Sequence, residues 1–385
     1  MALFRNGFRP FFLGAGIWAI VALAVRIAQL SGYEVESLAF RDPTLWHAHE
    51  LLFGYASAVV AGFSLTAIPN WTGRLPVAGN ALMALFALWI AGRVALFAPG
   101  VPDAARLAID GAFLPVLAGV AARELIAGKN MRNIPISALI GLLGSGNIVF
   151  HLEALGVIEL EKYGVRIGVA LLTMLIGLIG GRIVPSFTNN WLARNRLPST
   201  AVAPIMLDRL AHGSTAVAFL LWIALPASPF TGATLLIAGA IHARRLTTWQ
   251  GWRAVHEPLV FVLHIAYGWI PVGLVLLGAA TLLDPSLSSA GMHALTAGAI
   301  GTMTLAVMTR ATLGHTGREL HASTGTVGIY AAISASTLVR ITAAFELQFA
   351  DVLLPAAGVL WLVAFTLFVL LYGPMCLCPR SGAVA

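Results

Sequence analysis

The chain has 385 residues, of which 59% are hydrophobic and only 10% are charged. Soluble globular domains carry about 25% charged residues, so this composition excludes a soluble enzyme and indicates an integral membrane protein. The formal net charge of +7 would suit a nucleic-acid partner, but no nucleic acid is expected because the basic residues follow a membrane topology. The two cysteines, Cys376 and Cys378, lie together near the C-terminal end and predict no disulfide framework.

Twelve apolar stretches are long enough for membrane-spanning helices, which need about 20 residues each. In chain order they cover residues 11–30, 45–69, 78–98, 104–126, 134–156, 164–184, 207–226, 230–246, 258–282, 291–311, 324–345 and 352–373. The connections are short, and the sequence shows no convincing internal repeat. The short alternating segments of a membrane barrel are absent. We therefore predict an all-α polytopic membrane protein, with a single domain over residues 1–385.

The lysines and arginines set the orientation of these helices. If the N-terminus is cytoplasmic, most of the 23 basic residues fall on the cytoplasmic side of the predicted bundle. Both termini are therefore expected in the cytoplasm, and even-numbered helices run from the outer to the inner face. The positive charge is then a topology signal.

The second helix opens with the sequence WHAHE, residues 46–50. Ionisable side chains in a membrane segment are costly and by default mark a functional site. Neutral imidazoles in such a place commonly bind haem iron or copper. Residues three apart on a helix share a face, whereas residues two apart do not. We therefore expect His47 and Glu50 to face one way and His49 the other, so that the histidines serve two centres. The alternative is a pair of interfacial histidines bonded to loop carbonyls.

Four histidines from three helices gather at the outer level of the predicted bundle. They are His47, His49, His151 and His293, and we expect them to be metal ligands. Asn147, one turn before His151, is the candidate to hydrogen-bond the second nitrogen of that ring. Glu50 is the best candidate for proton handling.

At the inner level, His264 and His315 lie on consecutive predicted helices. They can form a second metal or haem site, or can equally be hydrogen-bonded packing residues. His242 and His256 flank a basic loop and are more typical of solvated interface residues.

Two arginines, Arg26 and Arg340, lie inside apolar stretches near the outer level. A cation there needs an anionic partner. Haem propionates would serve, and so would nearby acidic residues, namely Glu34, Glu36, Asp42 or Glu346.

Several motifs together resemble the NnrS family, in order and over essentially the whole chain. They are GFRPFF (7–12), WHAHE (46–50), AIPNWTG (67–73), EPL (257–259), LHIAY (263–267), MHALT (292–296) and LGHTGR (313–318). The resemblance implies a bacterial inner-membrane protein of twelve helices that contains haem b and copper. It also implies a role in nitric oxide metabolism and in resistance to nitrosative stress. A more distant likeness, to haem-copper oxidases and nitric oxide reductases, is architectural and assigns no function.

The most concrete function that follows is reduction of nitric oxide to nitrous oxide at a di-metal site. The electrons would come from an unknown donor. Membrane lipid is expected around the protein. A haem protein that only binds or senses nitric oxide is the first alternative. A transporter with structural histidines is the second, although paired broken helices or repeat symmetry, which transporters usually show, are not evident in the sequence.

Overall fold

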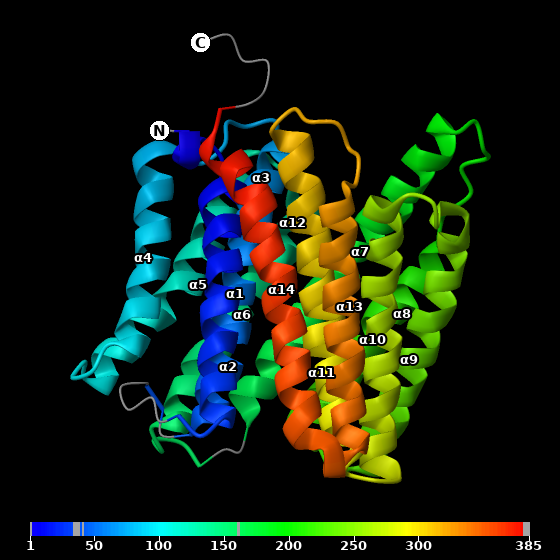
Figure 1. The fold of residues 1–385 in the computed structure, drawn as a ribbon. Coiled ribbons are helices and arrows are strands. Elements are labelled where there is room, and N and C mark those ends of the chain that lie inside the picture. The colour runs from blue at the N-terminus through cyan, green and yellow to red at the C-terminus, as the bar shows by residue number, and fades with distance from the viewer. Residues whose placement is uncertain (1, 34–38, 41, 160–161, 380–385) are drawn as a thin grey trace. The chain divides into compact units, whose positions relative to one another are not determined.

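The computed structural model describes residues 2–33, 39–40, 42–159 and 162–379 (Figure 1). In this part of the chain every regular element is helical, so the predicted all-α class is confirmed. The twelve predicted helices are all present. The uninterrupted ones are α1 (Phe8–Leu30), α4 (Gly79–Phe97), α5 (Asp103–Ala127), α6 (Ile134–Ala154), α7 (Tyr163–Arg194), α8 (Ile205–Ala224), α9 (Pro229–Thr248), α10 (Pro258–Leu282), α13 (Thr324–Phe345) and α14 (Ala350–Leu377).

The second and tenth helices are composite, because a π-helical segment interrupts each of them. The second consists of α2 (Pro43–His49), the π segment η2 (Glu50–Ala56) and α3 (Ser57–Thr72). The tenth consists of α11 (Leu287–His293), the π segment η5 (Ala294–Gly301) and α12 (Thr302–His315). Short 3₁₀ turns complete the list: η1 (Ala2–Arg5), η3 (Met131–Asn133), η4 (Gly251–Ala254) and η6 (Leu347–Phe349).

Within the described residues, 10 helical segments are long and apolar enough to cross a membrane. The composite helix Pro43–Thr72 is one of them. The helices α8 and α9 are not among the ten. These lengths and compositions are those of a multi-pass membrane protein.

The helices form two compact units. Unit 1 contains α1 to α6, the start of α7, residues 311–319 and the C-terminal part of α14 from Phe365. Unit 2 contains the remainder of α7, α8 to α11, α12 as far as Arg310, α13 and the first part of α14.

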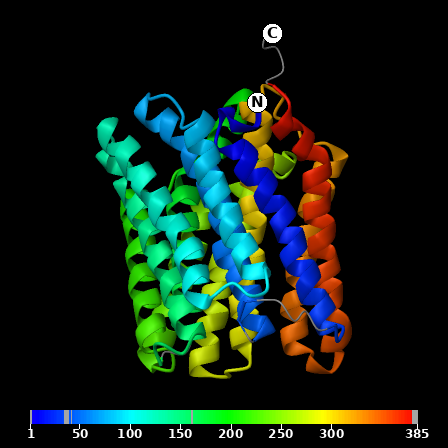
Figure 2. The same cartoon turned by 90° about the vertical axis from the view of Figure 1, so that its left-hand side faces the viewer.

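In unit 1, α5 packs against both α4 and α6, and α3 packs against α1 and α5 (Figure 2). The first turns of α1 bury Phe8, Phe11 and Phe12 completely. In unit 2, α9 packs against α8 and α10, and α11 packs against α10 and α13 (Figure 1).

Arg9 ties the two described ends of the chain together in unit 1. Its guanidinium Nη1 donates to the carbonyl oxygens of Cys376 at 2.9 Å, Met375 at 3.2 Å and Cys378. The last carbonyls of a helix lack partners within the helix, and a cation there also interacts favourably with the helix dipole. Arg9 therefore caps α14, and the two ends lie on the same side of the unit (Figure 1).

We expect Arg9→Met to destabilise the protein by about 1–3 kcal/mol, the usual range for a polar group left buried without its partner. Thermal unfolding of the purified protein in detergent measures this loss. The control is Arg5→Met, because Arg5 is exposed. Equal midpoints for the two variants would show that the cap contributes nothing.

Candidate functional site

Two imidazoles and one carboxylate meet inside unit 1. His49 ends α2, Asp110 lies in the first half of α5, and His151 lies one turn before the end of α6. Oδ2 of Asp110 is 2.9 Å from Nε2 of His151 and 3.1 Å from Nε2 of His49. The three ligand atoms all lie within 4.8 Å of one another, and the three residues are buried. Such a group has the size and donor types of a metal site.

A buried arginine connects this group to Glu50. Arg93 of α4 donates through Nη2 to Asp110 and through Nη1 to Glu50. Glu50 also accepts from the indole Nε1 of Trp18 at 2.6 Å, and its other oxygen lies 2.9 Å from Nδ1 of His49. Glu50 is fully buried and Arg93 is nearly so. Burial of single charges in a membrane protein is costly, so this pairing is what makes the cluster tolerable.

Both ring nitrogens of His49 face oxygen acceptors. Nδ1 faces Glu50, and Nε2 lies 2.8 Å from Oδ1 of Asn147 as well as near Asp110. The amide Nδ2 of Asn147 in turn donates to Asp110 at 2.8 Å. A doubly protonated His49 satisfies all these contacts. With Arg93 it then balances the charges of Glu50 and Asp110, so the cluster as a whole carries no net charge.

Two glycines create the space for these contacts. A Cβ on Gly54 would lie 2.5 Å from Nη1 of Arg93 and 2.8 Å from Oε2 of Glu50. A Cβ on Gly92 would lie 2.9 Å from Oδ1 of Asp110. Any larger residue at either position would push the arginine or a carboxylate out of place.

The structure corrects two expectations about this site. Glu50 was expected on the face of His47, away from His49, but its carboxylate contacts His49. The prediction assumed regular α-helical spacing, whereas a π-helical segment begins at Glu50 and the long side chain folds back toward the preceding residue. Asn147 was expected to hydrogen-bond His151, but it bonds His49 and Asp110 instead.

Of the four histidines predicted at the outer level, the structure brings His49 and His151 together in unit 1. The cluster with Asp110 does not include His47, which is half-buried on α2. His293 belongs to unit 2, where its Nδ1 lies 2.8 Å from the carbonyl oxygen of Ser289. The roles of His47 and His293 as ligands remain predictions.

The two histidines predicted at the inner level have separate neighbours in the described residues. His264 lies with Nε2 2.9 Å from Oγ1 of Thr188 in unit 2. His315 packs against the ring of Phe8 in unit 1, with 5.6 Å between ring centroids. The joint site for His264 and His315 remains a prediction.

Each of the two predicted intramembrane arginines donates to a hydroxyl group. Arg26 of α1 donates to Oγ1 of Thr44 at 3.4 Å, and Arg340 of α13 donates to Oγ of Ser289 at 3.3 Å. Asp42, the residue before α2, interacts electrostatically with Arg26, so this candidate partner is supported. Of the other acidic candidates, Glu34 and Glu36 lie outside the described residues.

His242 is not the solvated interface residue that the sequence indicated. It is fully buried in unit 2, with Nδ1 2.7 Å from the hydroxyl of Tyr267 and Nε2 2.7 Å from Oγ1 of Thr215. Arg245, from the same basic stretch, donates to the Tyr267 hydroxyl at 2.6 Å. The pairing of these groups explains the burial, because each polar atom has a partner. His256 is exposed, as expected.

The sequence reasoning missed Asp110 and Arg93. Neither residue belongs to the motifs from which the candidate site was predicted. A signal was available for both, because each is an ionisable residue inside a predicted membrane span, which by default marks a site. What the sequence does not show is that α4 and α5 pack against each other and bring Arg93 and Asp110 into contact.

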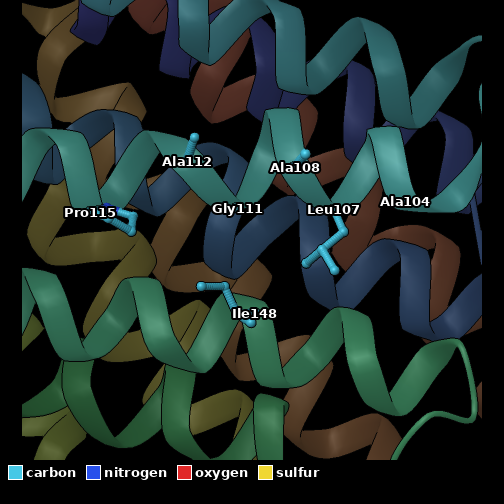
Figure 3. A pocket seen from close by; sticks show the side chains of 7 residues that line it. All are labelled: Ala104, Leu107, Ala108, Gly111, Ala112, Pro115 and Ile148. Atoms are coloured by element: carbon cyan, nitrogen blue, oxygen red, sulfur yellow. The ribbon is translucent and has the colours of Figure 1, made fainter.

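A shallow apolar groove of about 500 Å³ lies on the same two helices, α5 and α6 (Figure 3). Its lining includes Leu107, Gly111, Pro115 and Ile148. Successive residues on a helix point about 100° apart, so Gly111 lines this groove while its neighbour Asp110 faces the cluster. The groove contains no metal-ligating side chain, and the polar cluster is therefore the better candidate for chemistry.

Comparison with known protein families gives a match over nearly the whole chain. The family model described as NnrS protein matches residues 2–380. None of the curated proteins compared with this chain matches it. The matched range contains every residue of the His49–Asp110–His151 cluster.

Proposed function

This chain belongs to the NnrS family, whose members are membrane proteins linked to nitric oxide metabolism, and on that premise we propose that it reduces nitric oxide to nitrous oxide at a metal centre. The proposed ligands of that centre are His49, Asp110 and His151. The proposed location is the bacterial inner membrane. The observation that carries the proposal is the burial of these three ligands within 4.8 Å of one another.

The donor set supports a copper or iron ion. The family is associated with haem and copper in general terms, and two imidazoles with one carboxylate suit Cu(II) or ferrous iron. Cu(I) prefers thiolate and thioether sulfur, and the two cysteines are on α14 or beyond it rather than in the cluster. An ion bound at Nε2 of His49 would take the place of the proton there, because a metal-bound imidazole nitrogen carries no hydrogen.

The reaction consumes two molecules of nitric oxide, two electrons and two protons, and yields nitrous oxide and water. A bound metal ion would supply the site at which nitric oxide is held and electrons are delivered. The electrons come from a one-electron donor that the sequence does not identify.

The protein's own groups have separate roles in this proposal. Glu50 accepts from Nδ1 of His49 and thereby holds the ring with Nε2 toward Asp110, as carboxylates do behind metal-bound histidines. Glu50 is also the proposed carrier of protons. Arg93 holds both carboxylates in place through its two ion pairs.

The test uses purified full-length protein, metal analysis, and nitric oxide with a one-electron reductant. We expect His49→Ala and His151→Ala each to lose the bound ion and to lower nitrous oxide formation at least tenfold. His256→Ala is the control, because this histidine is exposed and outside the cluster.

Two results would overturn parts of this proposal. Full metal content in both ligand variants would remove the site. Tight binding of nitric oxide without any nitrous oxide would favour the alternative, a protein that binds or senses nitric oxide.

A further inference from the structure

Phe40, on the segment that connects α1 to α2, has an unusual backbone conformation. Its φ angle is 69°, in the left-handed region that bulky L-residues rarely adopt. Such a conformation costs free energy and persists only where the surrounding structure holds it. Glycine would adopt it without strain, so the presence of a phenyl ring at this position calls for an explanation.

The backbone on both sides of Phe40 is anchored. Ala39 is buried, and its N–H donates to the carbonyl oxygen of Leu96 at 3.0 Å. Asp42 caps the first turn of α2, where its side chain accepts from the N–H of Thr44 at 2.7 Å. These contacts restrain the segment around the left-handed residue and thereby fix where the phenyl ring lies.

The phenyl ring of Phe40 lies against both imidazoles of the candidate metal site. Its centroid is 5.3 Å from that of His49 and 5.4 Å from that of His151. It is also 5.4 Å from the ring of Phe150, which is itself 5.1 Å from the ring of His49. These are the distances of packed aromatic rings. One residue of the connecting segment therefore contacts proposed ligands from two different helices, α2 and α6.

Exposure distinguishes Phe40 from the other phenyl rings at this place. In the part of the chain that the structure describes, Phe53 and Phe150 also contact His49, and both are buried. Phe40 is only half-buried. Because this residue reaches the surface of unit 1 while its ring contacts both imidazoles, it separates them from the exterior on this side.

We propose that Phe40 controls access to the candidate metal site and restricts entry to ligands about the size of a diatomic molecule. Two imidazoles and one carboxylate leave coordination positions open on an ion, so the surrounding protein decides which ligands reach it. This role rests on the proposed function, because nitric oxide is small enough to pass the ring whereas larger molecules are not. The strained backbone is then a consequence of holding an aromatic ring over the site.

The first test is the rate at which diethyl pyrocarbonate modifies His151 in purified, metal-free, full-length protein. This reagent acylates imidazoles and is much larger than nitric oxide. His151 is followed because both ring nitrogens of His49 face oxygen acceptors. We expect the rate, measured by mass spectrometry, to rise at least tenfold in Phe40→Ala and in Phe40→Gly. The exposed His256 reports the reactivity of an accessible histidine in the same samples.

Two comparisons separate the ring from the backbone and from general loosening of the fold. Phe40→Gly removes the ring and the left-handed strain, whereas Phe40→Ala removes the ring and keeps the strain. We therefore expect Phe40→Gly to unfold at a higher temperature than Phe40→Ala, with equal modification of His151. Phe97→Ala is the matched control and should leave the rate unchanged. Phe97 is a ring of the same unit that is 37% exposed and contacts Trp46.

A second readout uses copper-loaded protein. We expect EDTA to remove the ion at least tenfold faster from Phe40→Ala than from the unsubstituted protein, because the chelator reaches the site only when the ring is absent. If the unsubstituted protein binds no copper while Phe40 still protects His151 from the reagent, the proposed function fails and the access role of Phe40 stands.

The inference is overturned if His151 is modified at the same rate with and without the ring of Phe40. It is also overturned if Phe97→Ala raises that rate as much as Phe40→Ala does, or if EDTA removes bound copper equally fast from Phe40→Ala and the unsubstituted protein.

Discussion

We expect Asp110→Ala to destabilise the protein by about 3–5 kcal/mol, the range measured when one partner of a buried ion pair is removed. The Asp110 carboxylate accepts from Arg93, His49, His151 and Asn147. Its removal leaves two cations, Arg93 and a protonated His49, facing the single carboxylate of Glu50. The cluster then holds an uncompensated positive charge away from water, in addition to the side-chain contacts that are lost.

The measurement is thermal unfolding of the purified protein, together with metal analysis of the same sample. Asp103→Ala is the control on the same helix, because the Asp103 side chain is 59% exposed and surface ion pairs contribute little. Asp110→Asn keeps the shape of the side chain and should lose metal while unfolding nearer to the unsubstituted protein. If Asp110→Ala and Asp103→Ala unfold alike, the charge balance described for the cluster is wrong.

The helices of this protein were predictable because the membrane imposes a single strong requirement on them. A hydrocarbon layer satisfies no backbone hydrogen bond, so each spanning segment must be apolar and helical over its whole length. The prediction for 324–345 matches α13, and that for 258–282 matches α10. The sixth helix was predicted to end at 184, but α7 continues through Pro185 to Arg194.

The histidines of the candidate site could be predicted from the sequence, but their contacts could not, because those depend on how the helices pack. His49 and His151 could be named because each is an imidazole inside an apolar stretch. Their joint contact with Asp110 depends on how α2, α5 and α6 pack, and helix order in the sequence does not determine neighbours in space. The contact between Glu50 and His49 was also missed, because the spacing in WHAHE predicts the two side chains on different faces of a regular α-helix.

Arg93→Met should reverse the imbalance that Asp110→Ala creates. It leaves two buried carboxylates, Glu50 and Asp110, with only His49 to balance them, so the cluster carries a net negative charge. We again expect a loss of about 3–5 kcal/mol in metal-free protein. A divalent ion should return much of this stability, because it binds the folded cluster and neutralises the carboxylates. Arg132→Met, an exposed arginine of unit 1, serves as the control.

The double variant Arg93→Met/Glu50→Gln separates charge balance from simple loss of contacts. Neutralising Glu50 restores the balance between His49 and Asp110, so we expect the double variant to be more stable than Arg93→Met alone. Residues in one buried network are expected to show such coupling, of about 0.5–3 kcal/mol. Unfolding midpoints of the four proteins in the cycle, measured without metal, give this coupling directly. Additive losses would mean that Arg93 acts through packing alone, and the description of the cluster as a neutral set of four charges would have to be abandoned.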